Sequence, residues 1–387
     1  MTLVRGRDAA VGVEHSDGVS AGGSVGTYAP YPLISFDHKV DAIPLEESDE
    51  LIAQGSRETV PPSQRQVIGT MVLRPRFDDP QFLKILCNAM GGTETRAVSQ
   101  DIYGYTGAHT GCNAHVVEAG GLQPRQWLRM NLGAAGLRID STCKFSKMVW
   151  EHAAGSTPRL SVDVLGIGPS AGTAAALALH TGVLPMRATS MEGTGIVALG
   201  SGDPHITWGP LGTSGYIALS NVTLFRVTLD HQMIQSSAYV NSALSFAELA
   251  GGDKTRSVEV ELEGEMPDSK VPSTPQTHPY YSYAAGQTPF SLDAVYSAKD
   301  AALGAGLISH GIRLSLPNVF PTEGSLAVAG PGILKWTVKG IAVMSDNYYP
   351  TDWDVPAAGI DFRVLFNVAP ADEVANNTGS YFCHQHA

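Results

Sequence analysis

Short runs in which apolar and polar residues alternate dominate this chain, and they constrain its fold more than any other feature. In Leu160–Leu165, for example, Leu160, Val162 and Val164 alternate with their neighbours. A period of two places successive side chains on opposite faces of a β-strand. Similar runs occur at Leu137–Phe145, Tyr216–Leu219, Val222–Leu229, Val258–Leu262, Ile312–Leu316, Ile333–Val343 and Phe362–Val368. Many short strands separated by Gly and Pro turns predict a mainly β fold of the sandwich or barrel type.

One segment has a helical period instead. Asp79 is a favourable N-cap, and Pro80 is a favourable first helical residue. An apolar stripe at helical spacing follows, and Gly91 comes directly after it. The stripe consists of Phe82, Leu83, Leu86 and Met90. We expect one helix of about three turns packed on a sheet, and a second, weaker helix from Ser291 to Ala302.

The strand signatures occur twice in the same order. Leu160–Gly166 matches Leu334–Gly340 in its alternation and its final glycine. The other two pairs are Gly136–Ile139 with Gly311–Leu314, and Arg65–Val67 with Arg256–Val258. Self-similarity of this kind is typical of duplicated modules. We interpret the chain as an N-terminal arm (1–28), two related modules (29–200 and 201–370) and a C-terminal tail (371–387).

Charge is scarce and its balance is acidic. Only 16% of the 387 residues are Asp, Glu, Lys or Arg, and the net charge is −12. Phosphate binding needs clustered Lys and Arg, so the chain is poorly suited to gripping nucleic acid. A folded chain with so few charges is expected to cover much of its surface with partners.

Other compositional signals are absent. The chain contains no stretch of 18 apolar residues and no secretory apolar region near its start, so we expect neither a membrane span nor secretion. Cys87, Cys112, Cys143 and Cys383 show no CxxC spacing, which favours buried free thiols in a reducing compartment.

One predicted strand carries a row of carboxylates. Val258, Val260 and Leu262 form its apolar face, and the opposite face carries Glu259, Glu261, Glu263 and Glu265, about 7 Å apart. Like charges in a row repel each other. The row is either an incidental exposed face or a surface that repels a passing polyanion or pairs with a basic strand. Arg74 and Arg76, on the polar face of a strand that we expect from Arg65 to Phe77, are candidates for such inter-module charges.

An acidic stretch follows Pro44. It contains Glu46, Glu47, Asp49 and Glu50. A solvated loop is the simplest interpretation.

Three motifs suggest chemistry, and we discount each. Gly166–Gly172 follows a strand, but its third glycine comes one place late and Pro169 interrupts it, so we expect a loop or hairpin rather than a dinucleotide-binding turn. Cys383–His386 lies in the terminal tail without a second ligand pair. Ser214 lacks the spacing of a nucleophile elbow. We expect no catalytic residue, no cofactor, no metal and no enzyme activity.

Taken together, these segments resemble the tail tube proteins of long-tailed bacteriophages. The resemblance spans residues 30–370 and departs from the family in insertions at 167–215 and 266–300. The segments that carry it are Gly69–Leu73, the helix from Phe82 to Gly92, Val116–Glu118, Gly136–Ile139, Leu160–Gly166, Gly311–Val319 and Asp361–Asn367.

The resemblance implies a β-sandwich or barrel module with a flanking helix, whose inner strands join those of neighbours into a closed barrel. Stacked rings would form a tube in the virion tail, assembled in the host cytoplasm, through which viral DNA passes without specific binding. A duplicated chain would form a trimeric ring with pseudo-sixfold symmetry, and a hexamer is the alternative. Other expected partners are a tape-measure protein and tail-end proteins. The Glu259–Glu265 row would face the lumen, and the Glu46–Glu50 loop would lie between rings.

Three other interpretations stay open. The chain could be another tail, baseplate or capsid protein, and a baseplate ring would stop at one or two rings. A sugar-binding sandwich would need exposed aromatic residues, for which Tyr280, Tyr281 and Tyr283 form the one cluster in the sequence. A hydrolase would need acid and base groups that converge from distant positions.

Overall fold

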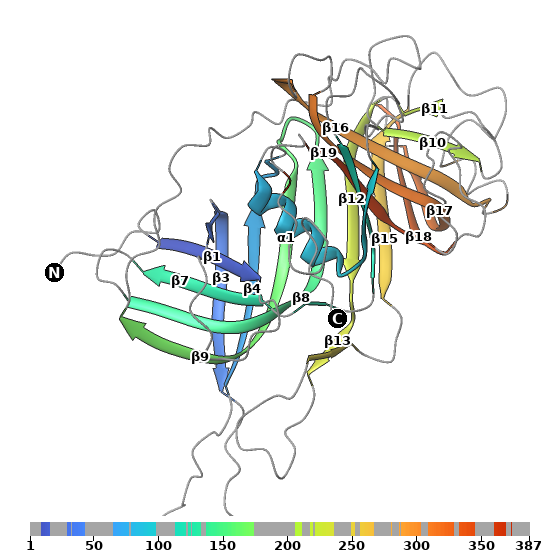
Figure 1. The fold of residues 1–387 in the computed structure, drawn as a ribbon. Coiled ribbons are helices and arrows are strands. Elements are labelled where there is room, and N and C mark those ends of the chain that lie inside the picture. The colour runs from blue at the N-terminus through green and yellow to red at the C-terminus, as the bar shows by residue number, and fades with distance from the viewer. Residues whose placement is uncertain are drawn as a thin grey trace, which may run out of the picture.

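The described part of the chain is mainly β, as the sequence predicts, and its ordered elements include one α-helix (Figure 1). This computed structural model describes residues 9–15, 29–31, 33–42, 65–76, 79–97, 113–120, 123–124, 126–132, 137–173, 206–210, 217–219, 221–235, 249–251, 256–266, 280, 286, 288–302, 309–328, 333–344, 360–368 and 373. The helix is α1 (Pro80–Met90). The strands are β1 (Ala9–His15), β2 (Ala29–Pro30), β3 (Leu33–Ala42), β4 (Arg65–Leu73), β5 (Glu94–Ala97), β6 (Asn113–Glu118), β7 (Gln126–Leu132), β8 (Leu137–Ala153), β9 (Arg159–Thr173), β10 (Ile206–Pro210), β11 (Ile217–Ala218), β12 (Val222–Asp230), β13 (Met233–Gln235), β14 (Leu249–Gly251), β15 (Ser257–Glu265), β16 (Phe290–Ala302), β17 (Ser309–Ala327), β18 (Lys335–Ala342) and β19 (Arg363–Val368).

Helix α1 has the bounds and the buried face that its sequence predicts. The Asp79 side chain accepts a hydrogen bond of 2.9 Å from the backbone N–H of Gln81, and Gly91 ends the helix with a φ of 61°. The helix packs against β6 and β8 (Figure 1). The predicted stripe of Phe82, Leu83, Leu86 and Met90 is buried.

The second helix predicted from Ser291 to Ala302 is wrong, because this segment forms strand β16. It pairs with β10 on one side and with β17 on the other. Apolar Leu292 and Tyr296 are buried, and so are polar Ser291 and Asp293. A strand buried on both faces has no clear period of two, so periodicity alone does not separate it from a buried helix.

The loop or hairpin predicted at Gly166–Gly172 is also wrong, because β9 continues to Thr173. Its end pairs with the start of β8, with Ala171 opposite Ile139. The register shifts where Asp140 faces Ser170 and Thr142 faces Ile167. Gly168 and Pro169 are therefore the extra residues of a β-bulge, where proline is tolerated within a sheet.

Strand pairing follows the same order in both halves of the chain. In the first half, β1 pairs with β2 and β7, β7 with β8, β8 with β9, β9 with β4, and β4 with β3. In the second half, β10 pairs with β11 and β16, β16 with β17, β17 with β18, β18 with β15, and β15 with β12. The two series match strand for strand, and we call matching strands counterparts.

Register determines which residues are counterparts. Val67 lies opposite Gly166, and Val260 lies opposite Gly340. If Gly166 is matched with Gly340, the counterpart of Val67 is Val260, two residues beyond the Val258 that sequence comparison matches. A shift of two residues keeps every side chain on the same face of the strand.

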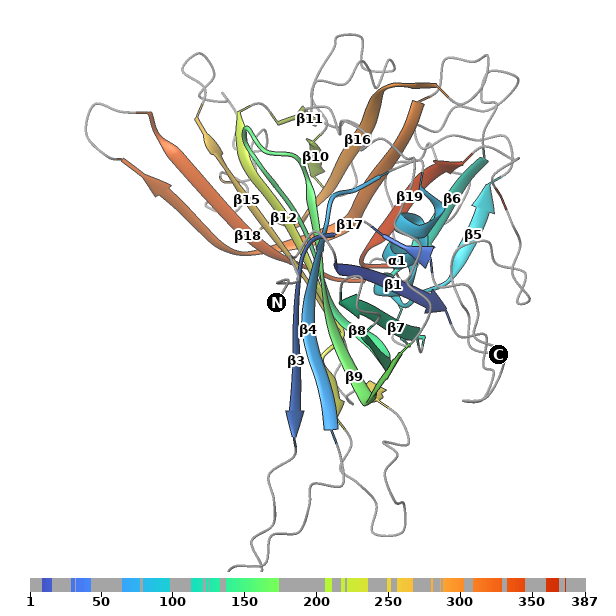
Figure 2. The same ribbon diagram turned by 90° about the vertical axis from the view of Figure 1, so that its left-hand side faces the viewer.

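The halves join through β8 and β12, which pair from Leu224 opposite Ala153 to Asp230 opposite Lys147. This joint makes one continuous antiparallel sheet in the order β3-β4-β9-β8-β12-β15-β18-β17 (Figure 2). Strand β19 makes a second connection, since it pairs with β6 of the first half and with β17 of the second. Strand β1 lies within the predicted arm and pairs with β7.

A single buried core spans both halves. Trp150 of β8 contacts the ring of Tyr296 of β16, with centroids 5.1 Å apart. Trp336 of β18 packs on Gly264 of β15, where an added Cβ would come within 2.6 Å of the indole. In the first half, Val162 is the counterpart of Trp336 and Met71 is the counterpart of Gly264. The two halves therefore fill equivalent space with side chains of different volume.

A charged sheet face as candidate functional site

Strand β15 has the two faces that its alternation predicts. Val258, Val260 and Leu262 are buried, and Glu259 is exposed on the opposite face. Glu261 is one-fifth exposed. The carboxylates therefore lie on the face of the sheet that points away from the core.

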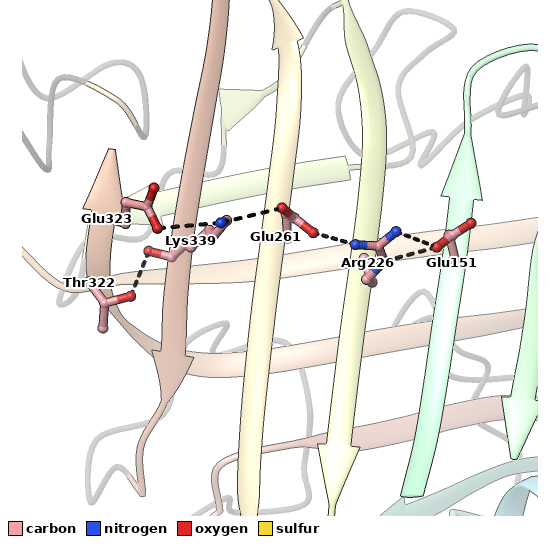
Figure 3. Close-up of polar contacts among 6 residues, drawn as sticks. All are labelled: Glu151, Arg226, Glu261, Thr322, Glu323 and Lys339. Atoms are coloured by element: carbon pink, nitrogen blue, oxygen red, sulfur yellow. Dashed lines mark hydrogen bonds and ion pairs between the residues drawn. The ribbon is translucent and has the colours of Figure 1, made fainter. Parts of the chain in front are cut away.

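Neighbouring strands place cations beside these carboxylates (Figure 3). Arg226 of β12 lies between Glu151 and Glu261, with its Nη2 2.6 Å from Glu151 Oε2 and its Nη1 2.5 Å from Glu261 Oε2. Lys339 of β18 lies 3.9 Å from Glu261 Oε1 and 3.3 Å from Glu323 Oε2. The residues Glu151, Arg226, Glu261, Lys339 and Glu323 are directly opposed across five strands, and we call them the charged row.

The charged row changes the interpretation of the glutamates on β15. Adjacent strands lie about 4.8 Å apart, whereas residues two apart on one strand lie about 7 Å apart. A cation on the next strand therefore acts on a carboxylate more strongly than the next glutamate does. Lys339 faces Glu261, and Lys335 faces Glu265. Glu261 and Glu265 thus face a cation across the sheet, whereas Glu259 and Glu263 face Ile341 and Thr337.

The electrostatics of Arg226 follow from this arrangement. Burial alone would lower the pKa of Arg226, but hydrogen bonds and charges from Glu151 and Glu261 outweigh burial and raise it. The Arg226 side chain is 37% exposed. Ion pairs at this exposure contribute about 0–1 kcal/mol each, so the charged row adds little to stability.

A shallow groove lies over the charged row. Its volume is about 520 Å³, and beside the charged row it is lined by Thr228, Glu259, Thr322 and Ile341. The Thr322 hydroxyl donates to the backbone carbonyl of Lys339 over 3.3 Å (Figure 3). Ile341 is 41% exposed beside Phe320, which is 40% exposed. The groove thus offers charged, hydroxyl and apolar groups on one open face.

The first half has a different row at the counterpart positions. Lys39 of β3, Ile68 of β4, Leu165 of β9 and Lys144 of β8 are directly opposed, and we call them the apolar row. Ile68, 39% exposed, is the counterpart of Glu261, and Leu165 is the counterpart of Lys339. Lys39 is the counterpart of Arg226, so one cation position occurs in both rows.

The structure does not bring Arg74 and Arg76 to the glutamates. Both follow the end of β4, where alternation no longer applies. The carbonyl of Arg74 accepts a hydrogen bond of 2.8 Å from the Tyr31 hydroxyl. Arg76 is buried, and its guanidinium lies 5.9 Å from the centre of the Tyr31 ring. Both residues therefore lie near the start of α1 and away from β15.

Several predicted features lie outside the described residues. These are the acidic loop of Glu46, Glu47, Asp49 and Glu50, together with Ser214, Tyr281, Tyr283 and Cys383–His386. Tyr280 is described, and it packs partly buried against the core. Cys87 and Cys143 are buried, and burial raises the pKa of the Cys143 thiol to about 12.

Sequence reasoning missed the cations of the charged row. Arg226 occupies a polar position of an alternating strand, which is a usable signal. No local signal says that β12 lies between β8 and β15, so the partners of Arg226 could not be predicted.

Within the described ranges, no three His, Cys, Asp or Glu side chains gather to hold a metal ion. Nor does that part of the chain include a helix long and apolar enough to cross a membrane. In comparisons with known proteins, no family model matches the chain, and no curated protein matches it either.

Proposed function

We propose that this chain is a structural subunit of a closed ring, and that such rings stack into the tail tube of a long-tailed bacteriophage. The observation that carries the proposal is the joint between β8 and β12, because it shows how one module adds to the next within a chain. The first module offers the second half of β8 as an edge, and β12 of the second module pairs with it.

The same two edges are open at the ends of the continuous sheet. Strand β17 is the counterpart of β8, and among the described residues its positions 320–327 pair only with β18. Strand β3 is the counterpart of β12, and within the described chain it pairs only with β4. Open edges of this length favour pairing with another chain.

Side chains of β3 are less buried than their counterparts on β12, as expected if β3 lacks a neighbouring strand on its open edge. His38 is half buried, whereas its counterpart Phe225 is fully buried. Desolvation lowers the pKa of His38 despite the nearby charge of Asp37. In the second half, β12 is flanked by β8 and β15. A strand added to the open edge of β3 would extend the cover over this face.

The joint predicts how copies of the chain meet. Pairing of β3 with β17 of the next copy repeats the β12–β8 joint, and repetition around an axis closes a ring. Thr228 lies opposite Val149 at the internal joint. Their counterparts are Asp41 and Ala327, which would face each other between copies. Two modules per chain favour three copies over six.

Electron microscopy of the purified protein tests the proposal. We expect filaments of uniform width built from stacked rings. Particles that stop at one or two rings would favour a baseplate-type ring, and monomers alone would overturn the proposal.

Cysteine cross-linking tests the joint itself. The variant Asp41→Cys with Ala327→Cys should give dimers and trimers on denaturing gels after oxidation, with no larger species from isolated rings. Asp37→Cys with Ala327→Cys is the matched control, because four residues along a strand displace the thiol by about 13 Å. Equal cross-linking in both variants would contradict the predicted register.

The charged face of the sheet is our proposed lumen surface. Compensated charge and remaining carboxylates such as Glu259 would let DNA pass without adhering. Changing Glu259, Glu261 and Glu263 together to Lys should leave tubes assembled and slow the release of DNA from virions. Release at the normal rate would refute the lumen assignment.

A further inference from the structure

The end of the β17–β18 hairpin exposes apolar side chains, and the hairpin projects away from the first half of the chain (Figure 2). Val328, directly after β17, is 69% exposed, the largest fraction among the exposed apolar side chains of the described residues. Leu326 of β17 and Leu334, directly before β18, are only partly buried. By alternation these three residues share the face of Trp336, which lies opposite Leu326. We call Leu326, Val328 and Leu334 the hairpin face.

The counterparts of the hairpin face in the first half are fully buried. Register makes Met148, Trp150 and Leu160 the counterparts of Leu326, Val328 and Leu334 respectively. Met148, Trp150 and Leu160 are each 0% exposed. The same positions of the repeated hairpin are therefore covered in one half and open in the other.

The cover in the first half comes from the second half, at the internal joint. Met148 lies opposite Leu229 of β12, and Trp150 lies opposite Val227. Trp150 also contacts the ring of Tyr296 of β16. The module that follows in the chain thus buries the hairpin end of the module before it.

We propose that the hairpin face is a docking surface for a second copy of this chain, whose β3 and first half cover it as β12 and the second half cover its counterparts. The inference rests on the proposed ring and adds the side chains that hold two copies together. Position 40 of β3 is the counterpart of Val227, so Val328 would lie opposite it. Large exposed apolar residues commonly mark such contacts.

The contact between copies would bury less apolar surface than the internal joint does. Two positions of β3 hold smaller or more polar residues than their counterparts on β12, namely His38 for Phe225 and Ala42 for Leu229. On the hairpin face, Val328 replaces an indole. The internal joint forms when one chain folds, whereas the contact between copies also costs the freedom of two separate chains. Assembly should therefore depend on chain concentration.

The variant Val328→Arg tests the docking surface. Arginine is solvated at this exposed position of a single chain, but it would be buried without a partner in the contact. Sedimentation of the full chain from nanomolar to micromolar concentration should show that half-assembly needs a concentration about tenfold higher, or more, than for the wild type. Assembly of Val328→Arg at the wild-type concentration would overturn the docking surface and leave the ring proposal standing. A wild-type chain that never assembles would refute both.

The matched control is Ile333→Arg. Ile333 is 59% exposed, and by alternation it lies on the opposite face from its neighbour Leu334. Its counterpart is Arg159, which is exposed although the internal joint is formed, so arginine is compatible with the joint there. Ile333→Arg should assemble as the wild type does. An equal loss of assembly in both variants would contradict a specific role of the hairpin face.

Cysteine labelling shows directly whether the surface becomes covered. The thiol of Val328→Cys should react with iodoacetamide in free chains and become protected in assembled rings, as read by mass spectrometry of its peptide. Ile333→Cys should react in both states. Equal labelling of Val328→Cys in both states would overturn the proposal. Protection already present in free chains would also overturn it, because the chain would then cover its own hairpin face.

Discussion

The charged row and the apolar row occupy counterpart positions in the two halves, yet their chemistry differs. Glu261 and Lys339 form ion pairs in one row, and Ile68 and Leu165 lie opposite each other in the other. The strands beneath them pair in the same order. The same order of paired strands therefore accepts either charged or apolar side chains on this face, because the face points away from the core. The charges of the second half are not needed to form the sheet.

The buried face beneath these rows differs in another way. The first half places Met71 opposite Val162, and the second half places Gly264 opposite Trp336. Close packing allows either a medium pair or a small residue beside a large one. On this buried face, the size of one residue limits the size of the residue opposite it. We therefore expect mutations on the buried face to change stability much more than mutations on the outward face.

The largest effect is expected from exchanging the buried pairs. Trp336→Val should lower the free energy of unfolding by about 3 kcal/mol, because it leaves a cavity over Gly264. Gly264→Met should cost about 3 kcal/mol through overpacking, since even a Cβ comes within 2.6 Å of the indole. The double variant should cost clearly less than the sum, measured by urea denaturation.

The control for these single and double variants is Met71→Leu, a substitution of similar volume at the counterpart of Gly264. It should lower the free energy of unfolding by less than about 1.5 kcal/mol. Additive costs in the double variant would show that Gly264 and Trp336 are not coupled, contrary to the packing described above.

A smaller effect is expected from converting the charged row into the apolar row. Changing Arg226 to Lys, Glu261 to Ile and Lys339 to Leu together should alter the free energy of unfolding by no more than about 1 kcal/mol, because exposed ion pairs contribute little. Glu261→Lys alone, which places a third cation between Arg226 and Lys339, should destabilise the chain more, and added salt should reduce that loss. A triple variant that fails to fold would contradict the equivalence of the rows.

The smallest effect concerns the contact of the second half with α1. His231 follows β12, and its Nε2 lies 2.7 Å from the carbonyl of Ala89 near the end of the helix. Burial lowers the pKa of His231 below its ordinary value of 6.5, with the Arg256 charge acting the same way and Ala89 and Asp230 opposing. The counterpart position after β3 lies outside the described residues.

A depressed folded-state pKa means that the unfolded chain binds more protons. Stability is therefore fully present above pH 6.5 and is lost as pH falls toward the folded-state pKa of His231. Thermal unfolding between about pH 5 and pH 8 should show this slope. His231→Gln should flatten the slope in part, because His38 and His152 also have lowered pKa values. An unchanged slope would show that His231 does not contribute.

Local features of the fold could be predicted because their causes are local. The Asp79 cap, Pro80 and the Gly91 terminus define α1 within one stretch of chain. The alternation of Val258, Val260 and Leu262 with glutamates defines the two faces of β15. Where local signals conflict with pairing, prediction failed, as in β16 and at the Pro169 bulge, because partners from distant parts of the chain determined the conformation.

The candidate site was predictable only in part. Glu261 could be placed on an outward face, but its partners Arg226 and Lys339 could not. No local signal predicts that His115 of β6 contacts Glu94 and Glu373, because the two glutamates are separated by most of the chain. Contacts of this kind depend on which strands become neighbours.

The sequence by itself determined the strand-rich fold, helix α1 with its caps, the faces of the strands and the repeated order of signatures. Only the tertiary structure decided that β12 lies beside β8, that Glu261 lies between Arg226 and Lys339, and that His115 contacts Glu373. The physical reason is that alternation and capping act over a few residues. Pairing joins distant segments, and the entropic cost of closing the intervening loop increases only slowly with its length, so many partners are open to each strand.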